Sequence, residues 1–376
     1  MINIQEINLS NKKERARFID LQWKIYKNNP NWVPQLKMAL HDLLNPKTHP
    51  FFETARVKAF MASDQKGNDV GRILAVINDT KNKLNNTKLG AFGFFESIDA
   101  IEVSSTLFKT AEKWLLENGM TSIEGPLNPS TNYDCGLLIN NFEDAPQIMM
   151  PYNLPYYERL IADYGFTKSM DLLAYRIDAH FKMPDIINRI ADRLEKKSNI
   201  TFRTLNLKKW DEELANMFEI DNSAWEANWG FVPMTKKEFE HTAKELKTVV
   251  NPKLVHFVEV NGKVAGFILT LPDLNQVFKQ IPDGKLLPTG VFKILFQKNK
   301  YINRSRTITL GIKKEYRKIG LETLLYKHNH QELQKLGIFK EFEMSWILET
   351  NLEMNKPLLT MGAEAYKTYR IFEKKI

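Results

Sequence analysis

The sequence predicts an α/β (α+β) fold made of two similar mixed-sheet domains in tandem, and three observations support this prediction. The 376 residues exceed the roughly 250–300 residues at which a single hydrophobic core stops growing, so the length favours two domains. Strand-like and helix-like segments alternate along the chain, which is typical of mixed folds. The third observation is an internal repeat: Asn153, Gly165 and Tyr175 are followed 198, 197 and 194 residues later by Asn351, Gly362 and Tyr369.

The first half, residues 1–180, contains the elements of one such domain. Runs of apolar residues predict strands at 55–62 and 71–78, joined by a polar turn, and a third strand at 89–95. An amphipathic helix follows and ends at Gly119, and a further strand begins at Ile123. A strand over 172–177 is expected to close this domain.

The second half, residues 181–376, repeats this order. Strands at 254–260 and 264–271 flank Asn261-Gly262, a pair typical of a type I′ hairpin turn. A strand at 307–312, a helix from about Gly320 to Leu336 and a strand at 341–348 come next. A last helix begins at about residue 352, and residues 366–372 form the final strand.

The composition is that of an ordinary globular protein. Hydrophobic residues make up 43% and charged residues 26% of the chain, which excludes a disordered or fibrous protein. Cys135 is the only cysteine, so an intrachain disulfide is impossible and a reduced cytoplasmic location is expected. No stretch approaches the ~18 apolar residues of a membrane span. The seven histidines show no metal-ligand spacing, so no metal site is predicted.

The net charge of +8 permits an anionic ligand. A nucleic-acid partner is disfavoured, because no basic stretch interleaves aromatic residues at the density of a binding module.

The most informative segment runs from Thr307 to Leu325, where a strand leads through a short basic loop into a helix. Backbone N–H groups at a helix start are unpaired and carry the positive end of the helix dipole, so they bind anions. Gly320 lets a ligand approach the backbone, and Arg317 and Lys318 add positive charge. This loop is therefore predicted to hold a pyrophosphate.

The strand, the Arg317-Lys-Ile-Gly320 loop, its helix and the later Asn351…Gly362 segment resemble the GNAT N-acyltransferase superfamily. In that superfamily such a loop binds the pyrophosphate of acyl-coenzyme A. The first half resembles the same fold, but it has no basic glycine-containing loop after its central strand. The whole chain is thus similar to a tandem GNAT protein with one donor site, in its second half. The resemblance implies that acetyl-CoA or another acyl-CoA is held by Leu310, Gly311, Ile312, Arg317, Lys318, Ile319, Gly320, Leu321 and Asn351.

Two residues depart from the superfamily pattern. Glu322 occupies the last Gly/Ala position of the loop, and Leu358 occupies the place of the tyrosine that usually protonates the leaving thiolate. The general acid therefore stays open: Tyr366 is our candidate, with Tyr369 or water as alternatives. Glu349, beside Asn351, is the candidate base or amine anchor, and Glu343 is the second candidate; a solvated strand residue is the alternative reading of both.

Two segments are candidates for the acceptor site. The aromatic segment after the first helix of the second half and the turn after residue 271 supply Trp225, Asn228, Trp229, Asp273 and Asn275. Packing of a helix end and ordinary turn chemistry are the alternative readings of these two segments.

The sequence therefore predicts an acyl-CoA-dependent N-acyltransferase that works by direct transfer. Acetyl is the expected acyl group, with longer chains left open, and the expected acceptor is a small amine or amino-acid-like molecule. A Fem-type aminoacyl-tRNA-dependent transferase and a non-catalytic ligand-binding GNAT protein are the alternatives. The sequence leaves a homodimer open.

Overall fold

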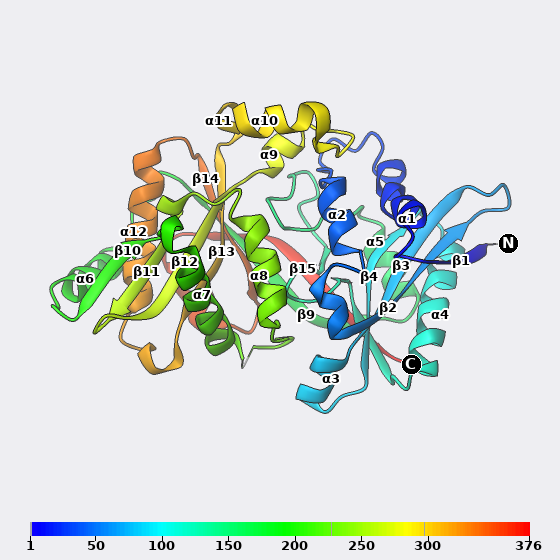
Figure 1. Cartoon of the computed structure of the whole chain (residues 1–376), viewed down its shortest axis with the longest axis horizontal. Coiled ribbons are helices and arrows are strands. Elements are labelled where there is room, and N and C mark those ends of the chain that lie inside the picture. The colour runs from blue at the N-terminus through cyan, green and yellow to red at the C-terminus, as the bar shows by residue number, and fades with distance from the viewer. Residues whose placement is uncertain (1, 227, 297) are drawn as a thin grey trace. The chain divides into compact units, whose positions relative to one another are not determined.

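The chain forms two compact units, shown in the computed structural model of Figure 1, which describes residues 2–226, 228–296 and 298–376. Unit 1 comprises residues 1–172, 277–297 and 367–376, and unit 2 comprises residues 173–276 and 298–366. The predicted division at residue 180 stays a prediction. The two units do not follow it simply, since two segments of the second half of the sequence belong to unit 1. In the described part of the chain, no helix is long and apolar enough to cross a bilayer.

Unit 1 is a mixed sheet in the order β1-β2-β3-β4-β5, extended by the second part of β15. Its elements are β1 (Asn3–Ile7), α1 (Lys12–Ile25), α2 (Lys37–Leu43), η1 (Pro50–Glu53), β2 (Ala55–Ser63), β3 (Asp69–Asn78), α3 (Asp79–Asn85), β4 (Leu89–Ser97), α4 (Ile101–Glu117), β5 (Ser122–Gly125), β6 (Leu127–Asn128), β7 (Asp134–Cys135), β8 (Leu137–Leu138), α5 (Tyr157–Asp163), η4 (Leu286–Gly290) and α10 (Val291–Phe296).

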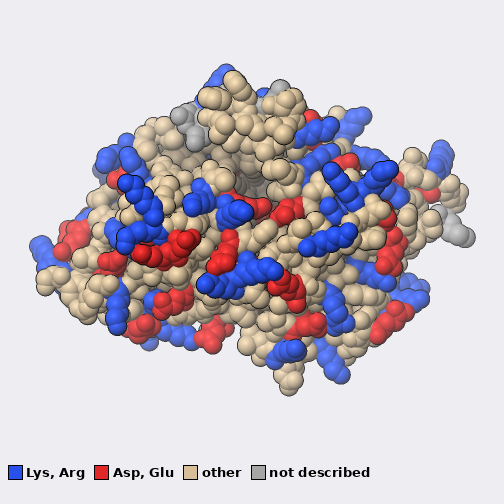
Figure 2. Space-filling model, in the orientation of Figure 1, with Lys and Arg blue, Asp and Glu red and all other residues tan. Residues whose placement is uncertain are grey.

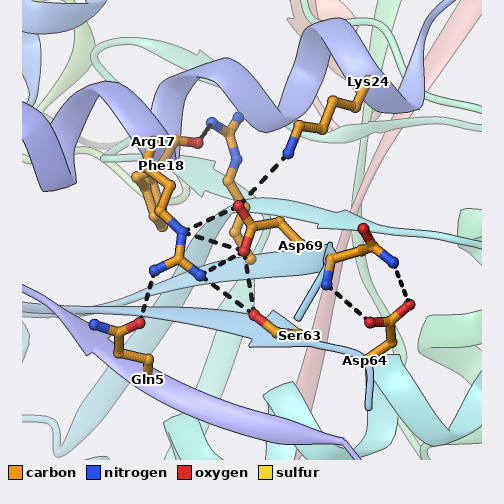
Figure 3. A network of polar contacts seen from close by, with 9 residues as sticks. Gln5, Arg17, Phe18, Lys24, Ser63, Asp64 and Asp69 are labelled. Carbon is orange, nitrogen blue, oxygen red and sulfur yellow. Dashed lines mark hydrogen bonds and ion pairs between the residues drawn. The ribbon is translucent and has the colours of Figure 1, made fainter. Parts of the chain in front are cut away.

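Two helices cover the sheet of unit 1. Helix α4 packs its apolar stripe, which includes Leu107, Phe108 and Ala111, against β2 and β3. Helix α1 is fixed through Arg17, whose guanidinium donates hydrogen bonds to Asp69 at the start of β3 and to Gln5 of β1 (Figure 3). Because Arg17 joins three elements, it sets the position of α1 on the sheet.

Unit 2 has the strand order β14-β13-β12-β11-β10, with the second part of β9 beside β14. Its elements are α6 (Asp185–Glu195), β10 (Ile200–Thr204), η2 (Leu207–Lys209), α7 (Trp210–Trp225), α8 (Lys236–Leu246), η3 (Pro252–Leu254), β11 (Val255–Val260), β12 (Lys263–Pro272), α9 (Asn275–Phe278, which ends in unit 1), α11 (Lys298–Tyr301), β13 (Arg304–Ile312), η5 (Lys314–Tyr316), α12 (Leu321–Leu336), β14 (Glu341–Leu348) and α13 (Leu352–Thr360).

The sheet of unit 2 is also covered on both faces. Successive residues of a strand point to opposite faces. Gly311 of β13 lies under Ile220 and Trp225 of α7, whereas its neighbour Ile312 packs with Leu321 of α12 and with α6. Helix α7 therefore lies on one face, and α6 and α12 lie on the other.

The two units share one topology, which confirms the predicted tandem arrangement. In unit 1, β2 pairs with β3 and β3 with β4 antiparallel, and β4 pairs with β5 parallel across the α4 crossover. In unit 2, β11, β12, β13, α12 and β14 repeat this pattern. The β11–β12 turn has positive φ at both Asn261 (51°) and Gly262 (73°), as the predicted type I′ turn requires.

The closing strands of the two halves are divided between the units. Strand β9 (Thr167–Asp178) leaves unit 1 after Leu172, and β15 (Glu364–Lys375) enters unit 1 at Lys367. Inside unit 1, β15 pairs antiparallel with β5, with Phe372 opposite Gly125. Each unit is thus completed by a strand that begins or ends in the other.

Candidate active site

The central feature of unit 2 is the separation of β13 from β14. The two parallel strands pair only from Arg304 to Thr307 on β13 and from Glu341 to Met344 on β14 within the described chain, although the strands continue to residues 312 and 348. Residues 307–310 of β13 are only half-buried. The strands therefore diverge and leave one side of β13 open.

The divergence coincides with a β-bulge on β13. Opposite β12, Thr307 pairs with Thr270 and Thr309 pairs with Leu269, so Ile308 is an extra residue. A bulge leaves its extra residue outside the ladder and turns the strand. Backbone polar groups of β13 at Ile308 are thus directed away from regular pairing at the point where β14 departs.

Helix α12 begins at the far end of β13. Gly320 is its N-cap residue, with a φ of +91° that favours glycine, and the cap has no side-chain hydrogen bond. Lys318, in the same turn, has a φ of 66° and is exposed. The first-turn N–H groups of this 16-residue helix and the Lys318 ammonium are the groups here that could hold an anion.

Arg317, which the sequence predicts to bind phosphate, contacts backbone carbonyl groups of its own chain. Its guanidinium donates to the carbonyl oxygens of Ala224 at 2.7 Å and of Ile312 at 3.3 Å. Ala224 lies in the last turn of α7, where carbonyl groups have no helical partner. Arg317 therefore fastens the end of α7 to the loop between β13 and α12.

The other residues expected at the donor site fall into two groups. Leu310, Gly311 and Ile312 form the end of β13 and Ile319 is exposed in the loop, whereas Leu321, the first residue of α12, is fully buried in the core. Asn351 is the N-cap of α13, where its Oδ1 accepts the N–H of Met354 at 3.2 Å.

A buried polar cluster lies where β13 and β14 are still paired. Arg306 and Glu343 are opposite each other in the register, and the Arg306 guanidinium donates to Ser345 Oγ at 2.7 Å. Glu343, which is fully buried, accepts hydrogen bonds from Ser345 Oγ and from the hydroxyl of Tyr366. The expected acid Tyr366 is thus held by a carboxylate, and Glu343 is part of a paired network. The expected base Glu349 is half-buried in the turn after β14.

Helix α7 carries a carboxyl group that the sequence analysis did not single out. Asp221 lies next to Ile220, which packs on Gly311 of β13. No hydrogen bond or ion pair joins its carboxyl to another residue in the described ranges. Asp221 is half-buried, and the partial removal of its carboxyl from water raises its pKa from 3.8 to about 7. A carboxyl group that titrates near neutral pH is suited to accept a proton from an amine.

The expected acceptor residues lie at two ends of β13. Trp225 packs beside Gly311, and the backbone N–H of Asn228 donates to the Trp225 carbonyl at 2.8 Å. Asp273 is buried, and its N–H donates to the carbonyl of Arg304, seven residues earlier on β13. At ~3.3 Å per strand residue, the two groups lie about 20 Å apart. The structure therefore brings Trp225, Asn228 and the half-buried Trp229 to the loop end, and Asp273 and Asn275 to the opposite end.

The equivalent place in unit 1 is closed. Strand β4 also has a bulge, between the pairs Arg72–Glu96 and Leu74–Gly93, but its residues 90–97 are all buried. The segment with β6 lies against the bulge: the carbonyl oxygen of Leu127 leaves no space for a side chain at Gly93, and Asn128 Oδ1 accepts the N–H of Phe94 at 2.6 Å.

A buried ion pair completes this closure of unit 1. Arg72 and Glu96 are 3.5 Å apart, and Tyr157 donates to Glu96 at 2.6 Å. Arg72 is fully buried and also donates to the carbonyl of Phe94 at 3.1 Å, so the bulge of β4 is occupied by the protein's own groups.

Comparisons with known proteins agree with this architecture. The chain is 35% identical over 378 residues to a protein of Caulobacter vibrioides (strain NA1000 / CB15N) named bacterial ceramide synthase, and the match covers 99% of this chain and 97% of the relative. It is 34% identical to Protein YghO of Escherichia coli (strain K12), over 97% of this chain and 94% of the relative. The chain belongs to the bacterial ceramide synthase/YghO family. No family model matches the sequence.

Solved structures show the fold of this chain. A tandem GNAT protein from the clavulanic acid biosynthesis pathway, solved without acetyl-CoA, superposes with a TM-score of 0.57 at 12% identity, covering 100% of this chain and 98% of that protein. A GCN5-related N-acetyltransferase from Sphaerobacter thermophilus gives a TM-score of 0.53 at 12% identity, with coverage of 100% and 95%. The predicted tandem GNAT fold is therefore confirmed.

Proposed function

We propose that this protein is an acyltransferase that moves a long acyl group from acyl-CoA to the amine of a long-chain amino alcohol. The observation that supports this proposal most strongly is the open divergence of β13 and β14 beside the start of α12. The equivalent place in unit 1, at the bulge of β4, is closed. The name of the Caulobacter relative supports the choice of acceptor, since a ceramide is a long-chain amino alcohol with an acylated amine. This proposal replaces the small acceptor and the acetyl donor that the sequence favoured.

The residues of unit 2 fit an acyl-CoA donor. The N–H groups at the start of α12 and the exposed Lys318 would hold the pyrophosphate, and the open edge of β13 at 307–310 would pair with the amide groups of the pantetheine arm. The backbone at the Ile308 bulge would donate a hydrogen bond to the thioester carbonyl and stabilise the oxyanion that forms there.

Asp221 is the proposed general base. It takes a proton from the acceptor ammonium, and the neutral amine attacks the thioester carbonyl. The new C–N bond forms, the attacking nitrogen gives up its second proton, the C–S bond breaks, and the coenzyme leaves as a thiolate that gains one proton, relayed from that nitrogen through water or a side chain. Glu349 is the alternative base and Tyr366 the candidate proton donor, and the substitutions Glu349→Gln and Tyr366→Phe test these two roles.

The test is a reconstituted reaction with purified protein, sphinganine and either palmitoyl-CoA or acetyl-CoA. Thiol release and the amide product are measured by absorbance and mass spectrometry. We expect the amide with palmitoyl-CoA, and a loss of about 10²–10⁴-fold in Asp221→Asn. Full activity in Asp221→Asn together with loss in Glu349→Gln would assign the base to Glu349. Absence of product with both donors would reject the acyl-CoA-dependent reaction and would redirect the search to aminoacyl-tRNA donors.

A further inference from the structure

A short segment of unit 1 exposes large apolar side chains to solvent. We call residues Leu286–Phe296, which comprise η4 and α10, the apolar segment. Leu287, Phe292, Leu295 and Phe296 have 73%, 61%, 60% and 70% of their surface exposed. The rings of Phe292 and Phe296 are 4.7 Å apart between centroids, so they form one continuous surface. Apolar residues on protein surfaces usually occur singly, and a cluster of this kind indicates an interaction site.

The base of the apolar segment is fixed to unit 1. Just before it, Val277 and Ile281 are buried in the core. Trp23 of α1 donates its indole N–H to the Pro282 carbonyl at 2.8 Å, and the Lys37 N–H donates to the Gly284 carbonyl at 2.9 Å. The segment is therefore held at its base while its large side chains point outward.

The charges around the apolar segment are mainly positive. Between residues 277 and 301 the sequence contains five lysines and a single acidic residue, Asp283. Lys279 and Lys285 are exposed. Figure 2 shows the surface at α10 as mainly uncharged, with Lys and Arg atoms at its margin. An apolar surface bordered by lysines is complementary to the headgroups and the acyl boundary of an anionic bilayer.

We propose that the apolar segment docks this protein on anionic lipid bilayers, with Phe292, Leu295 and Phe296 inserted below the headgroups. A second copy of the chain is the competing occupant. A two-fold contact through this face would set the lysines of one copy against those of the other, which repels, whereas anionic headgroups attract them. The docking surface goes beyond the proposed function and does not depend on it.

The test is flotation of the full-length protein with vesicles, without any substrate. Vesicles of phosphatidylcholine alone are compared with vesicles made of phosphatidylcholine and phosphatidylglycerol in equal amounts. We expect binding to the anionic vesicles, a loss of at least tenfold in the double variant Phe292→Ser/Phe296→Ser, and weaker binding in Lys279→Glu/Lys285→Glu. The matched control is Leu84→Ser/Leu352→Ser, which removes two apolar side chains that are exposed to a similar degree elsewhere and should bind like the wild type.

Three results would overturn the proposal. These are failure of the wild type to float with anionic vesicles, equal flotation of the Phe292→Ser/Phe296→Ser variant, and a wild-type dimer in sedimentation that this variant converts to a monomer. The last result would assign the surface to self-association. Thermal unfolding of the variant should match the wild type, because the substituted side chains are exposed, and vesicle binding is scored separately from acyl transfer.

Discussion

The glycines at the two ends of α12 give a matched pair of substitutions for the donor site. Gly320 has a φ of +91° and Gly337 a φ of +64°, so alanine at either position costs roughly 1–2 kcal/mol of strain. The surroundings differ. A Cβ at Gly320 would lie 2.8 Å from Cγ2 of Ile190, well inside ordinary carbon contact, whereas at Gly337 the nearest atom is the Gln334 carbonyl oxygen at 3.9 Å.

We expect both alanine variants to lose about 1–2 kcal/mol of unfolding free energy in denaturant titrations. Gly320→Ala must also shift the start of α12 against α6, so calorimetric titration with palmitoyl-CoA should show at least a tenfold weaker affinity, about 1.4 kcal/mol. Gly337→Ala should bind the donor like the wild type. Equal affinity in all three proteins would refute the assignment of the donor phosphates to this helix start.

Three further predictions concern titratable groups that are buried or half-buried. Because the pKa of Asp221 is raised to about 7, wild-type kcat/KM should rise with pH through that value, and Asp221→Asn should lose this step. The folded state also keeps this proton at higher pH than the unfolded chain does. Wild-type stability should therefore fall by up to about 1.4 kcal/mol per pH unit between pH 4 and 7, and the slope should be absent in the variant. His256 is fully buried and burial lowers its pKa to about 4, so the unfolded chain binds more protons than the folded one below pH 6.5. This lowers the wild-type free energy of unfolding by about 2 kcal/mol at pH 5 relative to pH 8, and His256→Phe should remove that loss. Urea unfolding measures it, and an unchanged pH dependence in the variant would contradict the prediction. Glu96→Leu would leave Arg72 buried without its carboxylate and should lower the free energy of unfolding by about 3–5 kcal/mol, whereas a loss below 1 kcal/mol would mean that the backbone carbonyls alone satisfy Arg72.

Local patterns predicted much of the fold. Asn261-Gly262 located a hairpin because few residues other than Asn and Gly adopt positive φ, and the spacing of Asn153 and Asn351 indicated two copies of one topology. The exchange of β9 and β15 between the units was not predictable. A strand sequence shows which residues are buried but not which neighbouring strand it pairs with. Buried residues occur in β9 on both sides of Leu172 and in β15 on both sides of Lys367, so the sequence of neither strand marks where it changes unit.

The candidate site was predictable only in part. The basic loop before α12 was readable because a strand, a glycine and a helix follow one another in sequence. The phosphate contact of Arg317 stays a prediction, and its carbonyl partner Ala224 could not be foreseen because it lies 93 residues away in the sequence. Asp221 gave no signal at all, since a single Asp in a mixed helix usually faces solvent. Its raised pKa comes from burial, which only the tertiary structure creates.

Hydrogen exchange with and without palmitoyl-CoA tests the central claim most directly. The open divergence in unit 2 is proposed to hold the donor, and the closed bulge in unit 1 is not. We therefore expect slower amide exchange on donor binding in residues 307–321, which include the end of β13 and the start of α12, and no change in residues 90–103 of unit 1. Protection in residues 90–103, or no protection in residues 307–321 under saturating donor, would contradict this assignment.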